Sequence, residues 1–320
     1  MTNHIEASDL AGQWRVYTED WDPAYGTPTT FELDATDSAD QVETGVGHVA
    51  SESGAAFPLA FIDGRRRAEL SLWAERSATG ERVPGLAGAY AVGAVTINPN
   101  GSADYAGVRI GRVAIWGAGH VGDISGSGYR WVSDSITATE PDLLLAHLQE
   151  RMRHAEGILA LQAAEAGWYV MLDGPLNHVR SLHALVAGYV KTHLRQILPD
   201  AAHVLVPTLA IGERTRMYAL GADRYTCYTR VGNPGPGGSP WSGIARLEFP
   251  SSPGIDAVAS RATEMASQLP RYAGVPHRDP RAPVNLTPVK NLENHLSQCM
   301  GRVELATRAA RTAVMHGAPT

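Results

Sequence analysis

The chain has 320 residues, of which 44% are hydrophobic and 19% are charged, so it can bury a full core and is not disordered. Its formal net charge of −6 excludes a broadly basic nucleic-acid coat but leaves room for a local basic groove. The two cysteines, Cys227 and Cys299, form no zinc-binding spacing and no disulfide framework, which favours a reducing compartment. The N-terminus lacks a signal-peptide pattern, and no apolar run approaches the roughly 20 residues of a membrane span, so we expect a cytoplasmic protein without membrane contact.

The first part of the chain predicts an irregular arm followed by a strand meander. Residues 1–55 are polar and acidic, and the two tryptophans among them predict that part of this arm packs on the body. Residues 57–74 predict a strand, a tight reversal and a second strand, and residues 85–97 and 108–116 predict further strands. Consecutive strands with short connections favour an antiparallel meander, which a Gly/Ser-rich loop follows at 117–128.

The rest of the chain alternates helices and strands. A helix is expected at about 140–166, with Thr139 as N-cap, Pro141 in the first turn and Gly167 at its end. Further strands are expected at 168–173, 185–191, 204–210, 215–231 and 242–249, and further helices at 254–270 and from Thr287 onward. The pattern as a whole predicts an α/β fold with a mixed sheet flanked by helices.

Two apolar runs each end in Asp-Gly, at Asp63-Gly64 and at Asp173-Gly174. Each run predicts a short buried strand that carries one carboxylate out of the core at its C-terminal end. Asp-Gly is a common turn signal, and either motif alone favours an ordinary turn. Two such strands side by side would instead hold two like charges together, which is unfavourable without a cation. The pair therefore favours a site for a hard divalent cation such as Mg²⁺ or Mn²⁺.

Other polar residues could complete such a site. Glu156 follows Met152 by four and precedes Leu159 by three, which places it on the buried stripe of its helix. A buried carboxylate is costly unless it is paired or binds metal; the alternative is an edge position where the side chain reaches water. In the last helix His295 lies at the margin of the apolar stripe, and Glu293 is the main competing ligand nearby.

Basic residues follow both motifs. Lys191 ends an apolar strand soon after Asp173, where it either contacts a phosphate or marks the point at which the strand reaches solvent. The run Arg65, Arg66 and Arg67 either orients a DNA backbone by charge or forms a solvated surface. Two hard cations held by carboxylates suit phosphodiester hydrolysis, since one activates the attacking water and the other stabilises the leaving oxygen.

The order of these segments resembles the NurA-type nuclease domain over roughly residues 57–300. The resemblance is carried by FIDGRRRAEL, a helix with an inward Glu, YVMLDGPL, LVAGYVKTHLRQILP, ARLEFP and LTPVKNLENHL, of which LDGPL and GYVKTH are the most specific. It implies a ribonuclease H-like fold for a nuclease domain at 56–310, with an N-terminal arm at 1–55 and a C-terminal tail at 311–320.

The resemblance also implies an activity and partners. NurA-type enzymes are Mn²⁺- or Mg²⁺-dependent 5′-to-3′ DNA exonucleases and single-strand endonucleases. They act on single- and double-stranded ends in DNA end resection and repair, as homodimers with a hexameric HerA-type translocase. The family's metal-binding and catalytic positions fall on Asp63, Asp173, Glu156 and His295, while Glu150 stays open as a substitute for Glu156.

Two other functions compete with a nuclease. A NurA-like chain without chemistry could serve as an assembly subunit of a translocase complex, although the intact Asp63 and Asp173 argue against this. A dinucleotide-binding oxidoreductase would need Gly-x-Gly-x-x-Gly between a strand and a helix with an acidic residue about 20 positions later, and no stretch of the sequence provides this.

Overall fold

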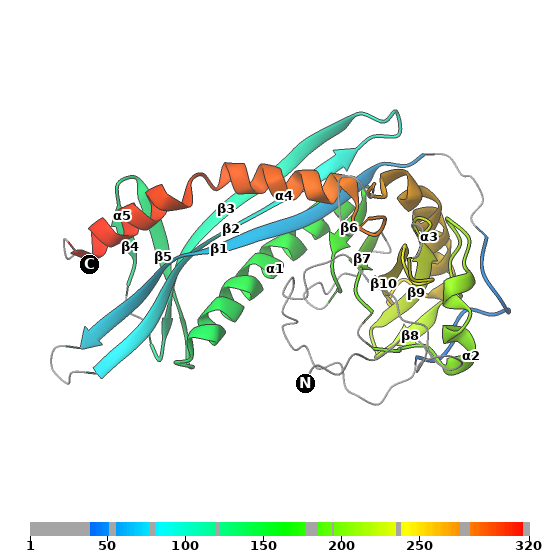
Figure 1. Ribbon diagram of the computed structural model, residues 1–320, viewed down its shortest axis with the longest axis horizontal. Coiled ribbons are helices and arrows are strands. Elements are labelled where there is room, and N and C mark those ends of the chain that lie inside the picture. Colours follow the sequence, from blue (N-terminus) through cyan, green and yellow to red (C-terminus); the bar gives the residue numbers. More distant parts are fainter. Residues whose placement is uncertain are drawn as a thin grey trace, which may run out of the picture.

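The computed structural model describes residues 39–50, 56–76, 81–119, 122–176, 185–193, 195–234, 238–275 and 282–315. Their strands form one ten-stranded mixed sheet in the order β4-β5-β3-β2-β1-β6-β7-β10-β9-β8. The molecule is elongated, because the long strands β1 to β3 run along most of its length (Figure 1). This arrangement confirms the expected α/β class with a mixed sheet flanked by helices.

Three long antiparallel strands form the expected meander: β1 (Leu59–Arg76), β2 (Glu81–Ile97) and β3 (Ala103–Gly117). The tight reversal expected within residues 57–74 is wrong, because β1 is a single strand of 18 residues. It pairs with β2 along its whole length, and Gly64 lies in the strand without a positive φ. A Cβ at Gly64 would lie 2.5 Å from the Glu156 carboxylate, so this glycine provides space for a helix side chain and not a turn.

Parallel pairing begins where the meander meets the next strands. β6 (Tyr169–Asp173) pairs in parallel with β1, and β7 (Val186–Val190) pairs in parallel with β6. An antiparallel set completes this side of the sheet: β10 (Ile244–Pro250), β9 (Arg224–Arg230) and β8 (Tyr218–Leu220).

At the other edge the structure departs from the sequence expectation. The Gly/Ser-rich stretch expected as a loop at 117–128 contains β4 (Ile124–Gly126), which forms a hairpin with β5 (Tyr129–Ile136). β5 pairs in parallel with the last residues of β3. Trp131 in β5 is fully buried and anchors the hairpin on the core. This one large side chain provides the apolar burial that the small residues of the Gly/Ser-rich stretch do not.

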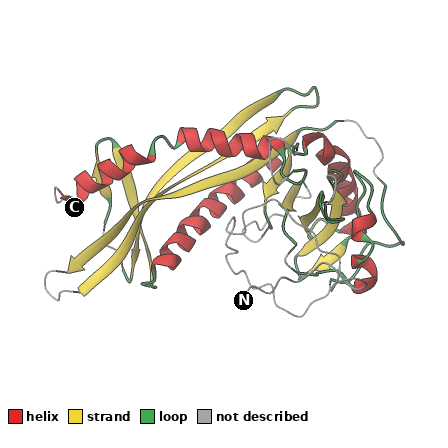
Figure 2. Cartoon of the chain, in the orientation of Figure 1, coloured by secondary structure: helices red, strands yellow, loops and turns green. Residues whose placement is uncertain are grey.

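Helices cover both faces of the sheet (Figure 2). α1 (Pro141–Glu165) packs on one face through Leu148 and Leu159, while α3 (Ile255–Gln268), α4 (Thr287–Cys299) and α5 (Val303–Met315) lie on the other face. The expected N-cap of α1 at Thr139 is wrong: Glu140 occupies the cap position, and no side chain caps the helix.

The sequence prediction also missed two helix boundaries. The strand expected at 204–210 is wrong, because α2 (Asp200–His203) and a 3₁₀ turn (Val206–Thr208) occupy this stretch. Pro207 in that turn has no backbone N–H to donate to a strand ladder. The last helix is broken in two at Gly301, whose φ of 73° ends α4 in the left-handed region.

Part of the N-terminal arm packs on the body. Gln41 bridges to Tyr218, Val49 bridges to Arg214, and the Glu43 carboxylate accepts two bonds from the Arg214 guanidinium. Residues 1–38, which include Trp14 and Trp21, lie outside the described residues, as do residues 316–320. The tail expected from residue 311 begins inside α5.

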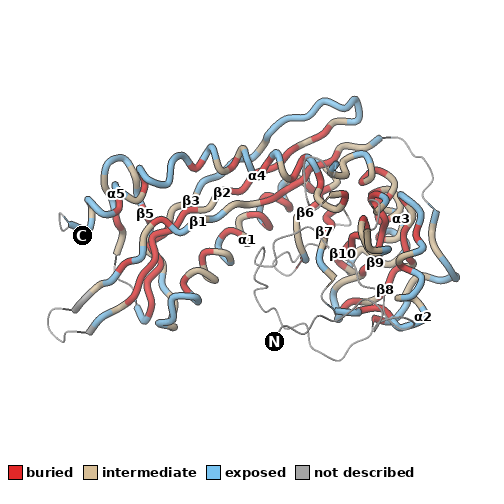
Figure 3. Tube along the Cα trace, viewed as in Figure 1, coloured by how far each residue is buried: buried red, intermediate tan, exposed pale blue. Residues whose placement is uncertain are grey.

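The largest core cluster lies between the sheet and the helices α3 and α4, and smaller clusters lie beneath α1 and α5. Buried residues are concentrated along the central strands (Figure 3). In the described ranges no helix is both long and apolar enough to cross a membrane.

Candidate metal centre

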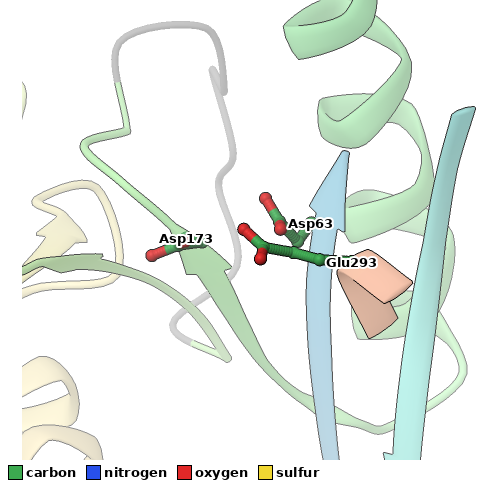
Figure 4. A group of neighbouring side chains, drawn as sticks. All are labelled: Asp63, Asp173 and Glu293. Carbon is green, nitrogen blue, oxygen red and sulfur yellow. The ribbon is translucent and has the colours of Figure 1, made fainter. Parts of the chain in front are cut away.

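Two strands and one helix bring three carboxylates together. The parallel register pairs Ile62 with Leu172, so the next residues, Asp63 and Asp173, are neighbours on one face of the sheet. α4 crosses this face and contributes Glu293. One carboxylate oxygen from each of the three residues lies within 4.8 Å of the others. The side chain of Glu293 reaches from α4 toward the two aspartates (Figure 4).

The end of β6 leaves room for this cluster. β6 stops at Asp173, and the register of β1 with β6 stops at Ile62. Gly174 then turns the chain away with a φ of 117°, a conformation that favours glycine. Asp173 is therefore at the C-terminal end of its strand, as expected, whereas Asp63 lies inside a strand that continues to Arg76.

A fourth carboxylate approaches from the opposite face of the sheet. Glu156 of α1 is only 2% exposed and reaches β1 where Gly64 lacks a side chain. The guanidinium of Arg153, one turn earlier, donates from Nη1 to Glu156 Oε2 and to the backbone oxygen of Asp173, both at 2.8 Å. Arg153 thus ties the helix carboxylate to the end of β6.

The electrostatics of the cluster favour a cation. Burial raises the pKa of Asp63 well above its usual value, and repulsion from the carboxylates of Asp173, Glu156 and Glu293 raises it further, against the attraction of Lys191. Burial likewise raises the pKa of Glu156, although its ion pair with Arg153 opposes this and Asp173 adds to it. Arg153 pairs with Glu156 and Lys191 pairs with Asp173, yet Asp63 remains under net repulsion from the neighbouring carboxylates.

The unpartnered oxygen atoms support the same conclusion. Asp63 Oδ2 and Glu156 Oε1 are buried and accept no hydrogen bond from any described residue. Buried polar atoms nearly always have a partner, and such exceptions are often explained by an ion or water. Carboxylate oxygens are the ligands that Mg²⁺ and Mn²⁺ prefer. The donor set therefore fits a hard divalent cation.

Lys191 belongs to this site. Its ammonium donates to Asp173 Oδ2 at 2.8 Å and to Asn285 Oδ1 at 3.0 Å, and its side chain is largely buried. Of the two roles left open for Lys191, a strand end in solvent is therefore wrong. The ion pair holds the Asp173 carboxylate in place at the cluster.

His295 lies outside the carboxylate cluster. Its ring stacks on Tyr105 with a centroid separation of 3.9 Å and an interplanar angle of 5°, and Nε2 lies 3.5 Å from the Cys299 sulfur. Residues two positions apart on an α-helix point about 200° away from each other around the axis, so Glu293 and His295 cannot face the same site. Glu293 follows Val289 by four and precedes Leu296 by three, the same spacing that pointed to Glu156, and this signal identifies it as the better candidate.

Glu150, the alternative to Glu156, also lies apart from the cluster. Its carboxylate is mostly exposed and lies 3.5 Å from Nδ1 of His147. The burial of Glu156 is as the helical spacing predicted. The inward carboxylate of α1 is Glu156.

The three arginines after Asp63 have different surroundings, because successive residues of a strand point to opposite faces. Arg67 donates to Glu69 and to the backbone oxygens of Met300 and Gly301, so it caps the C-terminus of α4. Arg66 points to the α1 face and donates to Gln149. Arg65 is half-buried and shares the face of Asp63, which makes it the arginine of the run best placed beside the cluster.

Comparisons with known proteins give little on which to base a function. No family model and no curated protein matches the chain. Among solved structures, the NurA nuclease from Sulfolobus solfataricus is similar over 82% of this chain and 86% of its own, at 12% identity and a TM-score of 0.40. A similarity at this level carries no argument about fold or activity.

Proposed function

We propose that this protein is a metal-dependent nuclease that hydrolyses phosphodiester bonds in DNA. The observation that carries the proposal is the gathering of Asp63, Asp173 and Glu293 from three separate elements, with a buried oxygen of Asp63 left without a partner among the described residues. Structural ion pairs do not require like charges to meet in this way. Electrostatic repulsion of this kind is compensated where a cation binds.

The residues of the cluster have separable roles. Asp63, Asp173 and Glu293 would hold the cations, with Glu156 completing the set from the other face. When bound, two Mn²⁺ or Mg²⁺ ions supply an activated water and neutralise the charge that develops on the leaving oxygen. Lys191 holds Asp173 and Arg153 holds Glu156, so two ligands are oriented before a cation arrives. Arg65 supplies positive charge on the same face, suited to the DNA backbone.

The finer aspects of the proposal depend on the sequence resemblance. We propose a NurA-type enzyme with a ribonuclease H-like core formed by β3-β2-β1-β6-β7, in which three antiparallel strands precede two that run parallel to β1. The resemblance further supports 5′-to-3′ exonuclease and single-strand endonuclease activity, a homodimer and a HerA-type translocase partner. His295 has no role in this cation site.

The test is degradation of end-labelled single- and double-stranded DNA by the purified protein in Mn²⁺, in Mg²⁺ and in EDTA. Asp173→Ala should abolish metal-dependent cleavage. The control is Asp223→Ala, since Asp223 is an exposed carboxylate at the β8–β9 turn, far from the cluster in the sheet order. Absence of cleavage in both metals, or equal cleavage by Asp173→Ala and wild type, would refute the proposal. Absence of cleavage would favour the assembly-subunit alternative.

A further inference from the structure

A groove of about 440 Å³ lies beside the carboxylate cluster and has no role in the function proposed above. Val95 and Ile97 of β2 form its apolar floor, and Tyr105 of β3 and Tyr272 form walls. The exposed residues Arg271, Asn291 and Asp104 also line it, so the groove carries one cation and one carboxylate. Its volume falls within the range of small-molecule sites, which are mostly apolar with a few polar groups that orient the ligand.

The groove and the cluster share one face of the sheet. Val95 pairs with Phe61, and residues directly opposite one another in an antiparallel pair point to the same face. Phe61 lies two residues before Asp63, so their side chains point to that same face. Tyr272 contacts the Phe61 ring edge-on, with centroids 5.1 Å apart. The floor of the groove therefore begins about 7 Å along the strands from Asp63, a distance of two residues.

The walls of the groove are preorganised for a flat aromatic ligand. Tyr105 is 47% exposed, yet its ring is held by the stack on His295 and its hydroxyl donates to the backbone oxygen of Asn291 at 3.3 Å. Both faces of an aromatic ring can stack, and one face of Tyr105 is already covered by His295. A tyrosine that is fixed and exposed at once loses little conformational entropy on stacking.

The rim supplies the charge for a phosphate. Arg271 is exposed, and it forms no ion pair with any other described residue. A guanidinium beside aromatic walls is the combination that binds nucleotides, because it pairs with a phosphate while the base stacks. An acidic or aliphatic peptide would use only one of these two features.

We propose that this groove binds one nucleotide of an unpaired DNA strand, with the base against Tyr105 and Tyr272 and its phosphate at Arg271. The proposal depends on the nuclease function above, and it gives the His295–Tyr105 stack a positioning role. A base in a duplex is already stacked and paired, so it would have to leave the helix to enter the groove. The groove therefore favours single strands, frayed ends or flaps over a closed duplex.

The test measures binding of a fluorescein-labelled oligothymidylate by anisotropy in EDTA, where no metal-dependent cleavage occurs. Tyr105→Leu should weaken binding about tenfold, the loss expected when one base no longer stacks. Arg271→Gln should lower the salt slope of log K by about 0.7, the contribution of one phosphate contact to a single strand. The matched control is Arg308→Gln, because Arg308 is exposed on α5 and away from the groove, and it should bind as wild type does.

A second readout separates the base from the backbone. Oligonucleotides with single abasic sites should include one position at which wild type binds about tenfold more weakly, and Tyr105→Leu should lose nothing further there. Three outcomes would overturn the groove assignment. Both variants could bind the oligonucleotide as tightly as wild type does, wild type could fail to bind it, or Arg308→Gln could lose as much affinity as they do. Hydrolysis of bis(4-nitrophenyl) phosphate, a diester without a base, by wild type in Mn²⁺ reads the carboxylate cluster alone. Its absence would count against the nuclease proposal and not against the groove.

Discussion

Replacing Asp63 with asparagine should stabilise the metal-free protein. Asp63 is 4% exposed, and its carboxylate is repelled by Asp173, Glu156 and Glu293. Asparagine has nearly the same shape, carries no charge and can donate to a neighbouring carboxylate. A hydrogen bond to a charged group contributes about 1.5–3 kcal/mol, so we expect the free energy of unfolding in EDTA to rise by roughly this amount at pH 7.5.

The pH dependence of this gain follows from linkage. Because the pKa of Asp63 is raised in the folded protein, the folded state binds more protons than the unfolded chain above the ordinary carboxyl value of 3.8. The stability of wild type should therefore fall as the pH rises from that value through the folded pKa, and Glu156, whose pKa is also raised, adds to the fall. In Asp63→Asn one of the two contributions is absent, so the fall should be shallower and the gain should vanish near pH 4.

The assay is urea denaturation in EDTA between pH 4 and pH 8, followed by tryptophan fluorescence. Asp134→Asn serves as the control, because a hydrogen bond from His147 lowers the pKa of Asp134 although burial opposes it. The same change there removes a favourable interaction and should destabilise the protein by up to about 1 kcal/mol. If Asp63→Asn were no more stable than wild type at pH 7.5, with an unchanged pH profile, the account of a repulsive carboxylate cluster would be wrong.

Three further tests address separate parts of the site. Gly64→Ala places a Cβ 2.5 Å from Glu156 Oε1 and should destabilise the protein by about 1–3 kcal/mol, measured by the same denaturation assay. Glu156→Gln should reduce metal-dependent DNA cleavage far more than Glu150→Gln, and equal loss in both would remove Glu156 from the site. Arg67→Ala should lower the free energy of unfolding by about 2 kcal/mol, because contacts to Glu69 and α4 are lost. Arg65→Ala should lower the salt slope of DNA binding without affecting stability. The reverse outcome would reassign the two arginines.

Periodicity predicted those parts of the fold that depend on local pattern. The helical spacing around Glu156 placed this residue on the buried face of α1, and the apolar run before Asp173 identified β6 and its end. Strand lengths were harder to predict, because Asp63-Gly64 has the composition of a turn. Its true environment depends on β2 and α1, which lie far away in the sequence.

The residues that make up the site could likewise be predicted only where local pattern decides their position. Helical spacing placed Glu293 on the apolar stripe of α4 as it placed Glu156 on α1, and it put His295 at the margin of the same stripe. Only the packing of α4 on the sheet brings Glu293 to Asp63 and Asp173. Arg153 was missed altogether, since an arginine three residues before a glutamate is ordinary on a helix surface. Only the end of β6 makes it a bridge, because the backbone oxygen of Asp173 accepts from the same guanidinium.

The central claim is that the carboxylate cluster binds hard divalent cations, and calorimetric titration of the metal-free protein with Mn²⁺ tests it most directly. Wild type and Asp223→Asn should bind Mn²⁺ alike, while Asp63→Asn and Asp173→Asn should each weaken binding by roughly tenfold or more. Because Asp63→Asn is expected to be the more stable protein, a loss of binding in this variant cannot be attributed to unfolding. Absence of Mn²⁺ binding by wild type, or undiminished binding in both cluster variants, would contradict the account.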